Sequence, residues 1–440
     1  METVEFIQEK TKSVNWRMTF KVLIIGVLTL VLLIPQMMIM GLISEREKTA
    51  NETKTEVMKQ WSMLNTVRGP VLTIPYIEHT YDNVNKVMGE EIRYCRFLPK
   101  SLNINGEIFP QERQRSIYKV MVYKSKIVLS GYFETPDFQA LNIKQEDIIW
   151  EKAQLIIGIN DLRGISESAE MLWNNQKYIF SPGMGEAFYG QEGISVQFNR
   201  DFINEFPGEF LCRLRLKGSD KLEFAPLGET TQVNLISEWN APGFVGNFLP
   251  EKKNITKSGF TADWKILHFN RNFPQVWKDN SYSMDKNDFG VRLVTLADHY
   301  QKNMRTAKYA ILIILFTFLS FFLNEIITKQ RIHPFQYILV GFAILIFYLL
   351  LLSVSEQIGF NSGYFIAAGC ILVMVLFYSR TFLNKWSGSF LLTAILAASY
   401  AFIFVLMQLE SFALLVGSIG LFVTLALVMF LTRKINWYNM

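Results

Sequence analysis

The sequence has few of the residues that build metal centres and disulfide frameworks. Its 440 residues include three cysteines, which excludes a disulfide-dense small domain. A bridge between Cys95 and Cys212 and two free thiols are both compatible with the sequence, while Cys370 lies in an apolar segment. The four histidines are widely separated and have no ligand-like neighbours, so no metal site is expected: His79, His268, His299 and His333.

Motifs that carry common enzyme chemistry are also missing. The sequence contains no phosphate-binding Gly-x4-Gly-Lys-Ser/Thr loop, no His-Glu-x-x-His pair and no Gly-x-Ser-x-Gly turn. A glycine-rich stretch at 181–193 follows a polar segment and opens no helix, which favours a surface loop. We therefore expect no catalytic residues and no cofactor, and we predict that the protein is not an enzyme.

Charge is almost absent from the last third of the chain. Between Tyr309 and Thr432 the charged residues are Glu325, Lys329, Arg331, Glu356, Arg380, Lys385 and Glu410. The rest of the chain has a charge density typical of soluble protein. A soluble part joined to a membrane part is therefore predicted, which excludes a cytosolic enzyme and a disordered protein. Residues 44–308 hold 34 basic and 33 acidic residues, and this balance argues against a nucleic-acid partner.

Six apolar runs are long enough to cross a lipid bilayer, whose hydrocarbon core is about 30 Å thick. The first, 22–43, follows four basic residues as a signal peptide would, but signal cores are shorter, about 7–15 residues. An uncleaved transmembrane helix is therefore predicted there. The five further predicted helices are about 309–327, 336–353, 363–378, 390–407 and 412–431.

The distribution of basic residues predicts which side each loop occupies. Six helices place both termini on one side, and ten Lys or Arg residues flank the helices on that side. The two short loops of the other side, around Glu356 and Glu410, contain neither Lys nor Arg. By the positive-inside rule, the N-terminus (1–21) and the tail (433–440) are cytoplasmic, and residues 44–308 face outward.

The outward domain is predicted to be rich in β-strands. The charged stretch 44–64 lacks Gly and Pro and is expected to continue the first helix. Beyond it, runs of β-branched and aromatic residues alternate with turn residues, and 117–123 and 126–133 are read as two neighbouring strands. The predicted fold class is a mixed α and β membrane protein: one N-terminal transmembrane helix, a large antiparallel β domain forming a sandwich or curled sheet, and a five-helix transmembrane bundle.

A carboxylate inside a membrane segment is a candidate functional residue, and Glu325 is the clearest case. The alternative, which we favour, is a shallow residue that reaches water or pairs with Lys329 one turn later. His333 precedes Pro334 and is read chiefly as a helix start, with a pH-sensing role as the alternative. Glu356 is expected to be solvated at the outer end of its helix. Further candidates lie where the β domain joins the second helix: Asp298, Arg305 and Lys308.

Charged and proline-bearing segments follow one another in a fixed order at these junctions and in the outward domain: 246–250, 258–264, 297–301, 305, 308–312, 325, 331–341, 347–352, 355–356, 359–360 and 430–438. These segments resemble the CreD family of inner membrane proteins, and the likeness covers nearly the whole chain, thinning between about 135 and 235. The resemblance implies a bacterial inner membrane protein, with the outward domain in the periplasm. The family has no established catalytic residues to assign to this sequence.

What the resemblance implies is a non-enzymatic role in cell-envelope integrity and in the response to envelope or β-lactam stress. The lipid bilayer is the expected surrounding, and the periplasmic domain is expected to bind a protein, lipid or cell-wall component. A transporter or flippase-like protein with a pathway near Glu325 is one alternative, and a membrane stress sensor is another. The oligomeric state does not follow from the sequence.

Overall fold

The chain folds into two compact units. The computed structural model describes residues 16–63, 65–81, 87–185, 192–279, 281–284, 286–293, 299–328, 332–383, 386–409 and 412–433. Residues Met1–Ala50 and Ala297–Met440 form one unit, here called the helical unit, and Asn51–Leu296 form the other, the β unit. Helix α1 (Trp16–Trp61) is continuous from the first unit into the second.

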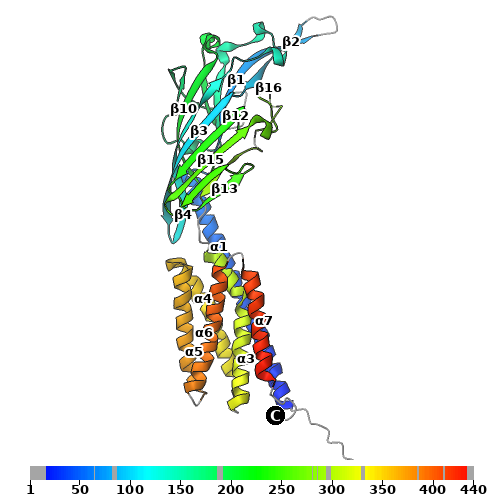
Figure 1. The fold of residues 1–440 in the computed structure, drawn as a ribbon, viewed down its shortest axis with the longest axis vertical. Coiled ribbons are helices and arrows are strands. Elements are labelled where there is room, and N and C mark those ends of the chain that lie inside the picture. Colours follow the sequence, from blue (N-terminus) through cyan, green and yellow to red (C-terminus); the bar gives the residue numbers. More distant parts are fainter. Residues whose placement is uncertain are drawn as a thin grey trace, which may run out of the picture. The chain divides into compact units, whose positions relative to one another are not determined.

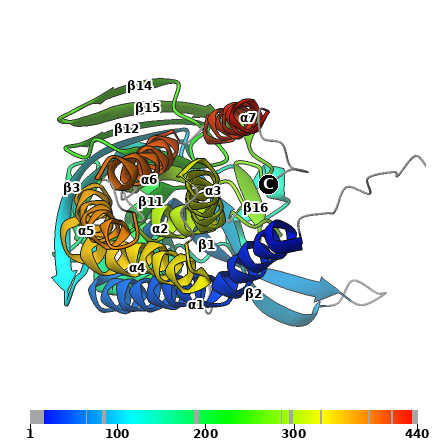
Figure 2. The same cartoon turned by 90° about the horizontal axis from the view of Figure 1, so that it is seen from below.

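The helical unit consists of the first part of α1 and six further helices (Figure 1). These are α2 (His299–Lys308), α3 (Ala310–Thr328), α4 (Pro334–Ile358), α5 (Phe360–Arg380), α6 (Trp386–Gln408) and α7 (Ala413–Thr432). Seen end-on in Figure 2, α3, α4, α5 and α6 surround a common centre, and α7 lies outside this ring. Each predicted apolar run therefore coincides with a helix.

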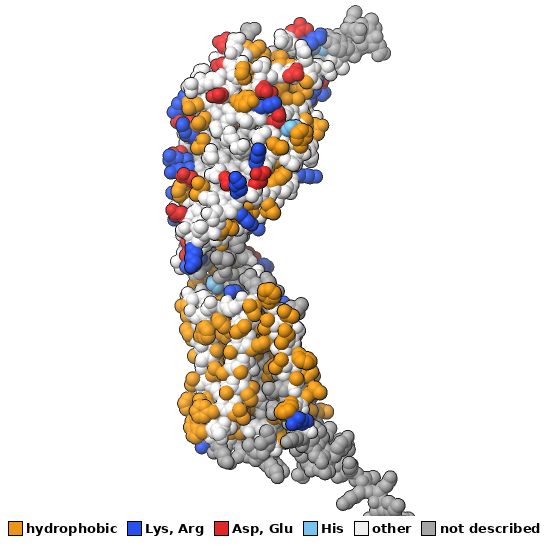
Figure 3. Space-filling model, in the orientation of Figure 1, with side chains coloured by type: hydrophobic (Ala, Val, Ile, Leu, Met, Phe, Trp, Pro, Cys, Tyr) orange, Lys and Arg blue, Asp and Glu red, His pale blue; other side chains and the backbone are white. Residues whose placement is uncertain are grey.

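Length and composition fit these helices to a membrane. Among the described residues, five helical stretches are long and apolar enough to cross one: Phe20–Trp61, His299–Ile326, Pro334–Ile358, Phe360–Arg380 and Trp386–Gln408. Hydrophobic side chains cover the face of the helical unit in Figure 3, whereas charged side chains are scattered over the β unit. Because lipid tails solvate such a surface, apolar side chains can face outward here without loss of stability.

The β unit contains two sheets that share one hydrophobic core. The nine-stranded sheet has the order β13 (Pro242–Gly246), β17 (Phe289–Leu293), β11 (Lys221–Phe224), β1 (Asn65–Tyr81), β5 (Gln154–Ile159), β9 (Gly193–Gln197) and β8 (Ser181–Pro182), with β2 (Val87–Phe97) on β1 and β16 (Val276–Lys278) on β2. The eight-stranded sheet has the order β14 (Lys252–Thr256), β15 (Gly259–Leu267), β12 (Thr230–Ser237), β3 (Ser101–Arg115), β4 (Tyr118–Phe133), β10 (Gly208–Ser219), β6 (Glu170–Trp173) and β7 (Gln176–Ile179).

The predicted class of fold is confirmed, with two corrections in the sheets. The stretches 117–123 and 126–133 are not two strands but the single strand β4, because Lys124 and Ser125 introduce no turn. Both residues pair with β3 and β10, and the Ser125 hydroxyl donates to Leu216 O at 3.4 Å. The sheets are also not wholly antiparallel, since β1 pairs with β11, and β3 with β12, in parallel.

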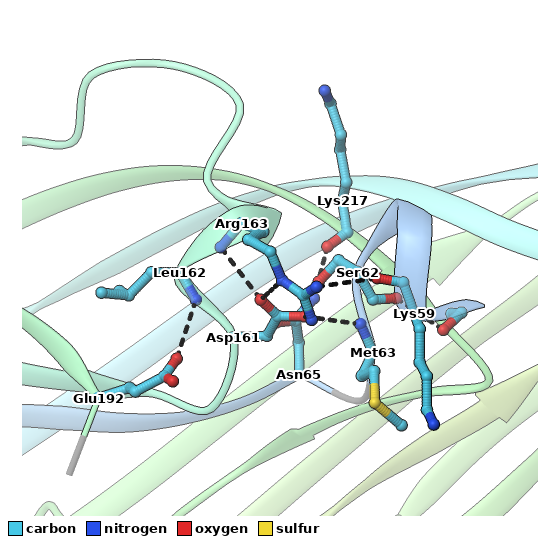
Figure 4. A network of polar contacts seen from close by, with 10 residues as sticks. Lys59, Ser62, Met63, Asn65, Asp161, Leu162, Arg163, Glu192 and Lys217 are labelled. Atoms are coloured by element: carbon cyan, nitrogen blue, oxygen red, sulfur yellow. Dashed lines mark hydrogen bonds and ion pairs between the residues drawn. The ribbon is translucent and has the colours of Figure 1, made fainter. Parts of the chain in front are cut away.

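The C-terminal end of α1 belongs to the β unit and is held to the rest of that unit by a polar network (Figure 4). Arg163 donates to Lys59 O at 3.0 Å and forms an ion pair with Asp161 at 2.9 Å. Asp161 also accepts from Met63 N at 2.9 Å. Burial would raise the pKa of Asp161, but these hydrogen bonds to its charged form outweigh burial and lower it.

A second set of contacts holds the same helix end. The ring of Trp61 lies 4.6 Å from the guanidinium of Arg113 and 5.4 Å from the ammonium of Lys217. Cations above an aromatic face are attracted to it, so β3 and β10 of the eight-stranded sheet both stabilise the position of the Trp61 indole. Ser219 Oγ donates to Ser62 O at 2.7 Å, which satisfies a carbonyl left free where the helix ends.

Replacing the central carboxylate should loosen this junction. In Asp161→Ala the Met63 amide loses its acceptor, so we expect its hydrogen exchange to accelerate, by about fivefold for a net bond strength near 1 kcal/mol. Because the folded-state pKa of Asp161 is lowered, its stabilising effect is present at neutral pH and is lost only as the pH falls below about 4. Mass-spectrometric hydrogen exchange at pH 7 measures the effect. The exposed Asp201→Ala is the control, and unchanged exchange at Met63 would contradict the assignment.

Candidate functional site

Glu325, the main candidate from the sequence, lies near the end of α3 and forms an ion pair with Lys21 of α1. Lys21 Nζ also donates to Ile332 O at 3.1 Å. Both side chains are largely buried, with 14% of Glu325 and 22% of Lys21 exposed. Lys329, the partner considered from helical spacing, lies outside the described residues. The carboxylate is therefore engaged by a cation 304 residues away, which helical periodicity does not reveal.

His333 caps the start of α4. The imidazole Nδ1 of His333 accepts a hydrogen bond from Phe335 N at 3.2 Å, and the backbone N–H of His333 donates to Gln336 Oε1 at 3.0 Å. Together these bonds form a capping box, in which two helix-end N–H groups find side-chain acceptors. The helix start expected at Pro334 is present, and the exposed imidazole has a structural role there.

Glu356 lies near the opposite end of α4 and is hydrogen bonded, not simply solvated as expected. Its Oε1 accepts from Tyr300 Oη of α2 at 2.9 Å. One residue earlier on α4, Ser355 Oγ accepts a hydrogen bond from Asn303 Nδ2, which also belongs to α2, at 2.8 Å. A Cβ on Gly363 of α5 would lie 2.9 Å from Ser355 N, so a side chain there would disturb this contact between helices.

The remaining predicted candidates flank this group. On α2, Arg305 is half-buried and Lys308 is exposed, while Lys302 Nζ lies 5.8 Å from the ring centre of Phe360. Asp298 lies outside the described residues. The candidates therefore fall at the two ends of α4, a helix of 25 residues, or about 37 Å at 1.5 Å per residue. They do not converge on one site.

The β unit contains a hollow that sequence reasoning missed. Its volume is about 550 Å³, within the range of small-molecule sites. Two separate segments line it: Thr135, Pro136, Phe138, Gln145, Glu146, Ile148, Ile149, Trp150 and Glu151 from one, and Ile203 and Phe206 from the other. Most belong to short 3-10 turns and connections, which leave no periodic pattern in the sequence.

Aromatic packing and backbone pairing hold the hollow in shape. The ring of Phe138 lies 5.5 Å from Trp150 and 5.2 Å from Phe97, and Trp150 lies 6.2 Å from Phe206. Ile149 N donates to Pro75 O at 2.9 Å, which fixes the segment to β1. Because Phe97 and Phe138 belong to the core of the unit, and Trp150 and Phe206 pack against that core, the hollow is built into the fold.

The chemistry of the lining is aromatic and acidic. Glu146 and Glu151 supply two carboxylates, and none of the lining residues is basic. Aromatic faces attract apolar surfaces and cations, and carboxylates accept hydrogen bonds from amines and hydroxyls. A ligand with an apolar face and a positive or hydrogen-bond-donating group fits this lining.

The part of the chain that the structure describes contains no group of three or more His, Cys, Asp and Glu side chains placed to hold a metal ion. Cys95 and Cys212 are both buried free thiols, which decides between the two states that the sequence allowed. Burial raises the pKa of Cys95 to about 12 and that of Cys212 above its ordinary value, so neither is a ready nucleophile.

A β unit inserted after the first of several membrane-length helices defines a multi-pass membrane protein with a large extramembrane domain. Residues 17–438 match the family model described as inner membrane protein CreD, and the chain belongs to the CreD family. It is 33% identical over 413 residues to the inner membrane protein CreD of Escherichia coli strain K12, covering 93% of this chain and 91% of that protein. The family predicted from the sequence is thus confirmed.

The Lys21–Glu325 pair predicts a structural effect of changing Glu325. Glu325→Gln leaves Lys21 without its counter-charge, and breaking a buried pair costs about 3–5 kcal/mol, less for a pair that is partly exposed. We expect a lower melting temperature and less protein in the membrane. A solute pathway alone would instead remove activity at an unchanged protein level.

The charge exchange Lys21→Glu with Glu325→Lys tests whether the ion pair stabilises the helical unit, as opposed to Glu325 serving only a solute pathway. The exchange restores attraction between α1 and α3, so it should recover much of the stability lost in either single reversal. Thermal unfolding of the purified variants measures this recovery. If the double variant is as unstable as the sum of the singles, the ion pair does not stabilise the unit.

Proposed function

We propose that this protein supports the integrity of the bacterial cell envelope by binding an envelope component through the hollow of its β unit, without catalysing a reaction. Residues 1–21 and 433–440 are cytoplasmic in this proposal, and 44–308 lie in the periplasm. The family places the chain in the inner membrane, and the ten basic residues that flank one side of the helices support the orientation.

The observation that carries the proposal is the 550 Å³ hollow with aromatic walls and an acidic rim. A pocket of this size in a rigid two-sheet unit suits a small molecule or one group of a larger one. Its charge favours an envelope molecule that bears an amine or several hydroxyls beside an apolar face. A protein partner would reach the same place through one inserted side chain.

The helices serve mainly to anchor and position the β unit in this proposal. A solute pathway through Glu325 is a weaker interpretation, because the carboxylate is paired with Lys21 and its ion pair ties α1 to α3. A sensing role would require a ligand-dependent change that the hollow could start. Neither alternative explains why the lining of the hollow is aromatic and acidic.

A photo-crosslinking experiment tests the binding site directly. A photoreactive residue at Ile203, on the lining of the hollow, should give a discrete adduct in living cells. Ile92 is the matched control, because it is equally exposed (47% against 46%) but lies on β2, outside the lining. Equal labelling at both positions, or only diffuse labelling of lipid, would argue against a specific ligand.

The role of the hollow in envelope integrity is tested by removing one aromatic side chain from its lining. Trp150→Ala should reduce survival of a strain that depends on this protein when detergent and a β-lactam are added, because removal of a large ring at a binding site costs about 2 kcal/mol or more of binding. Trp239→Ala, which changes another half-buried tryptophan outside the hollow, is the control. Immunoblots must show equal protein levels. Full resistance in Trp150→Ala would reject the hollow as the functional site.

A further inference from the structure

One buried face of α4 carries three polar side chains along most of the helix. Tyr337, Tyr348 and Ser355 follow one another at intervals of 11 and 7 residues, which return to the same face within about 20° at 100° per residue. All three are buried, each with 2% or less of its surface exposed. The row is about 27 Å long at 1.5 Å per residue, close to the thickness of a hydrocarbon core.

Helix α6 carries a matching row. Ser389, Thr393 and Tyr400 are spaced by 4 and 7 residues and therefore share one face. Ser389 is fully buried, and Tyr400 is 2% exposed. Since α5 runs back between them, α4 and α6 run in the same direction, and Tyr348 and Tyr400 each lie 14 residues after the first residue of their helix.

Ring contacts join α4, α5 and α6 in the interior of the bundle at the level of Tyr348 and Tyr400. The ring of Phe347 on α4 lies 4.5 Å from that of Tyr400 on α6 and 5.2 Å from that of Tyr364 on α5. Tyr364 Oη donates to Tyr400 O at 2.8 Å. The phenol of Tyr348 lies within electrostatic range of both other phenols, so three helices contribute tyrosines to one place.

Most of these polar atoms have no protein partner among the described residues. They are the hydroxyls of Tyr337, Tyr348, Tyr400, Ser389 and Thr393. By contrast, Thr29, Thr317 and Ser399 each donate to the carbonyl four residues earlier in their own helix, the usual solution in a membrane helix. These five hydroxyls therefore differ from ordinary hydroxyl residues of the same bundle, whereas Ser355 Oγ donates to Leu352 O of its own helix at 3.0 Å.

At each end of the rows lies a further buried polar atom that has no hydrogen-bond partner among the described residues. At one end Tyr337 lies beside Glu325, whose Oε2 is buried without a hydrogen bond although Oε1 pairs with Lys21. At the other end Asn303 donates to Ser355 through Nδ2, while its Oδ1 is buried without a partner. The unsatisfied atoms thus extend from the Lys21–Glu325 pair to the Asn303–Ser355 pair.

We propose that α4 and α6 bind a file of ordered water molecules between these two pairs. A buried hydroxyl without a partner is costly, and the lipid cannot supply one, whereas a water molecule can bridge two or more such groups. The waters join Glu325 Oε2 to Tyr337 at one end and reach Asn303 at the other. This hydrated core is a site of the helical unit and is independent of the hollow in the β unit.

Radiolytic labelling of the unaltered full-length protein is the first test. X-ray pulses turn bound water into hydroxyl radicals, which oxidise the nearest side chains even where bulk solvent does not reach. We expect Tyr348 and Tyr400 to be oxidised several times faster than Tyr123. Tyr123 is the matched control, because it is fully buried in the β unit and its hydroxyl already donates to Lys221 O at 2.8 Å. Equal rates at all three positions overturn the proposal.

Removal of the Tyr348 hydroxyl gives a second test, because the melting temperature should change in opposite directions for a hydrated and a dry core. If Tyr348 binds water, Tyr348→Phe removes one of the partners of that water and lowers the melting temperature, by about 2 °C or more. If the core is dry, the same change removes an unsatisfied group and raises it. Tyr364→Phe should lower it in either case, because that hydroxyl has a carbonyl acceptor, and so verifies the sensitivity of the assay. A higher melting temperature in Tyr348→Phe overturns the proposal.

Discussion

The hydrocarbon interior of a bilayer offers no hydrogen bonds, and the helical unit is organised around this constraint. Its helices satisfy their own backbones, and its strong polar contacts lie between helices: Lys21 with Glu325, Gln36 Nε2 with Ala307 O at 3.0 Å, and Asn303 with Ser355. Each contact joins segments that are distant in the sequence, and the first two tie α1 to the later helices. Polar side chains in this unit therefore specify which helices pack together, a task that apolar contact alone performs poorly in lipid.

The β unit follows a different logic. Long paired strands such as β3, β4 and β10 provide a rigid body, and the hollow lies on irregular segments between strands. Binding residues commonly lie on connections held by a rigid scaffold. Here the scaffold reaches into the lining itself, because Phe138 and Trp150 contact both the hollow and the shared core. Ligand binding at this place would not require the sheets to move.

Much of the fold could be predicted from the sequence, because the strongest signals were local. Apolar runs predicted α1 and the helices from α3 to α7, although not the polar helix α2, and β-branched and aromatic residues predicted the extended stretch that forms β4. β1 was missed because Gly69, Pro70 and Pro75 look like turn residues, yet the strand accommodates the first two at a shift of register between Arg68 and Val71. Both parallel strand pairs join segments more than 120 residues apart, a separation at which local patterns carry no information.

The candidate site was predictable only in part, for the same physical reason. A carboxylate in an apolar helix identified Glu325, but its partner Lys21 could not be found by helical spacing. The role of His333 as a helix start followed from the adjacent proline. The hollow was not anticipated, because its residues come from two irregular segments about 50 positions apart, and only the folded sheets bring Trp150 and Phe206 together.

The distance in sequence between Lys21 and Glu325 has a consequence for how the protein is made. The chain is synthesised from its N-terminus, so α1 enters the membrane when neither α3 nor the carboxylate exists. The hydrogen bond between Ser219 Oγ and Ser62 O at the end of α1 likewise cannot form until most of the β unit has been synthesised. Helix α1 is therefore the first element inserted and among the last to be completed. A ribosome that stops before residue 325 leaves behind a helix that still carries an unmatched cation, which distinguishes an unfinished chain from a finished one.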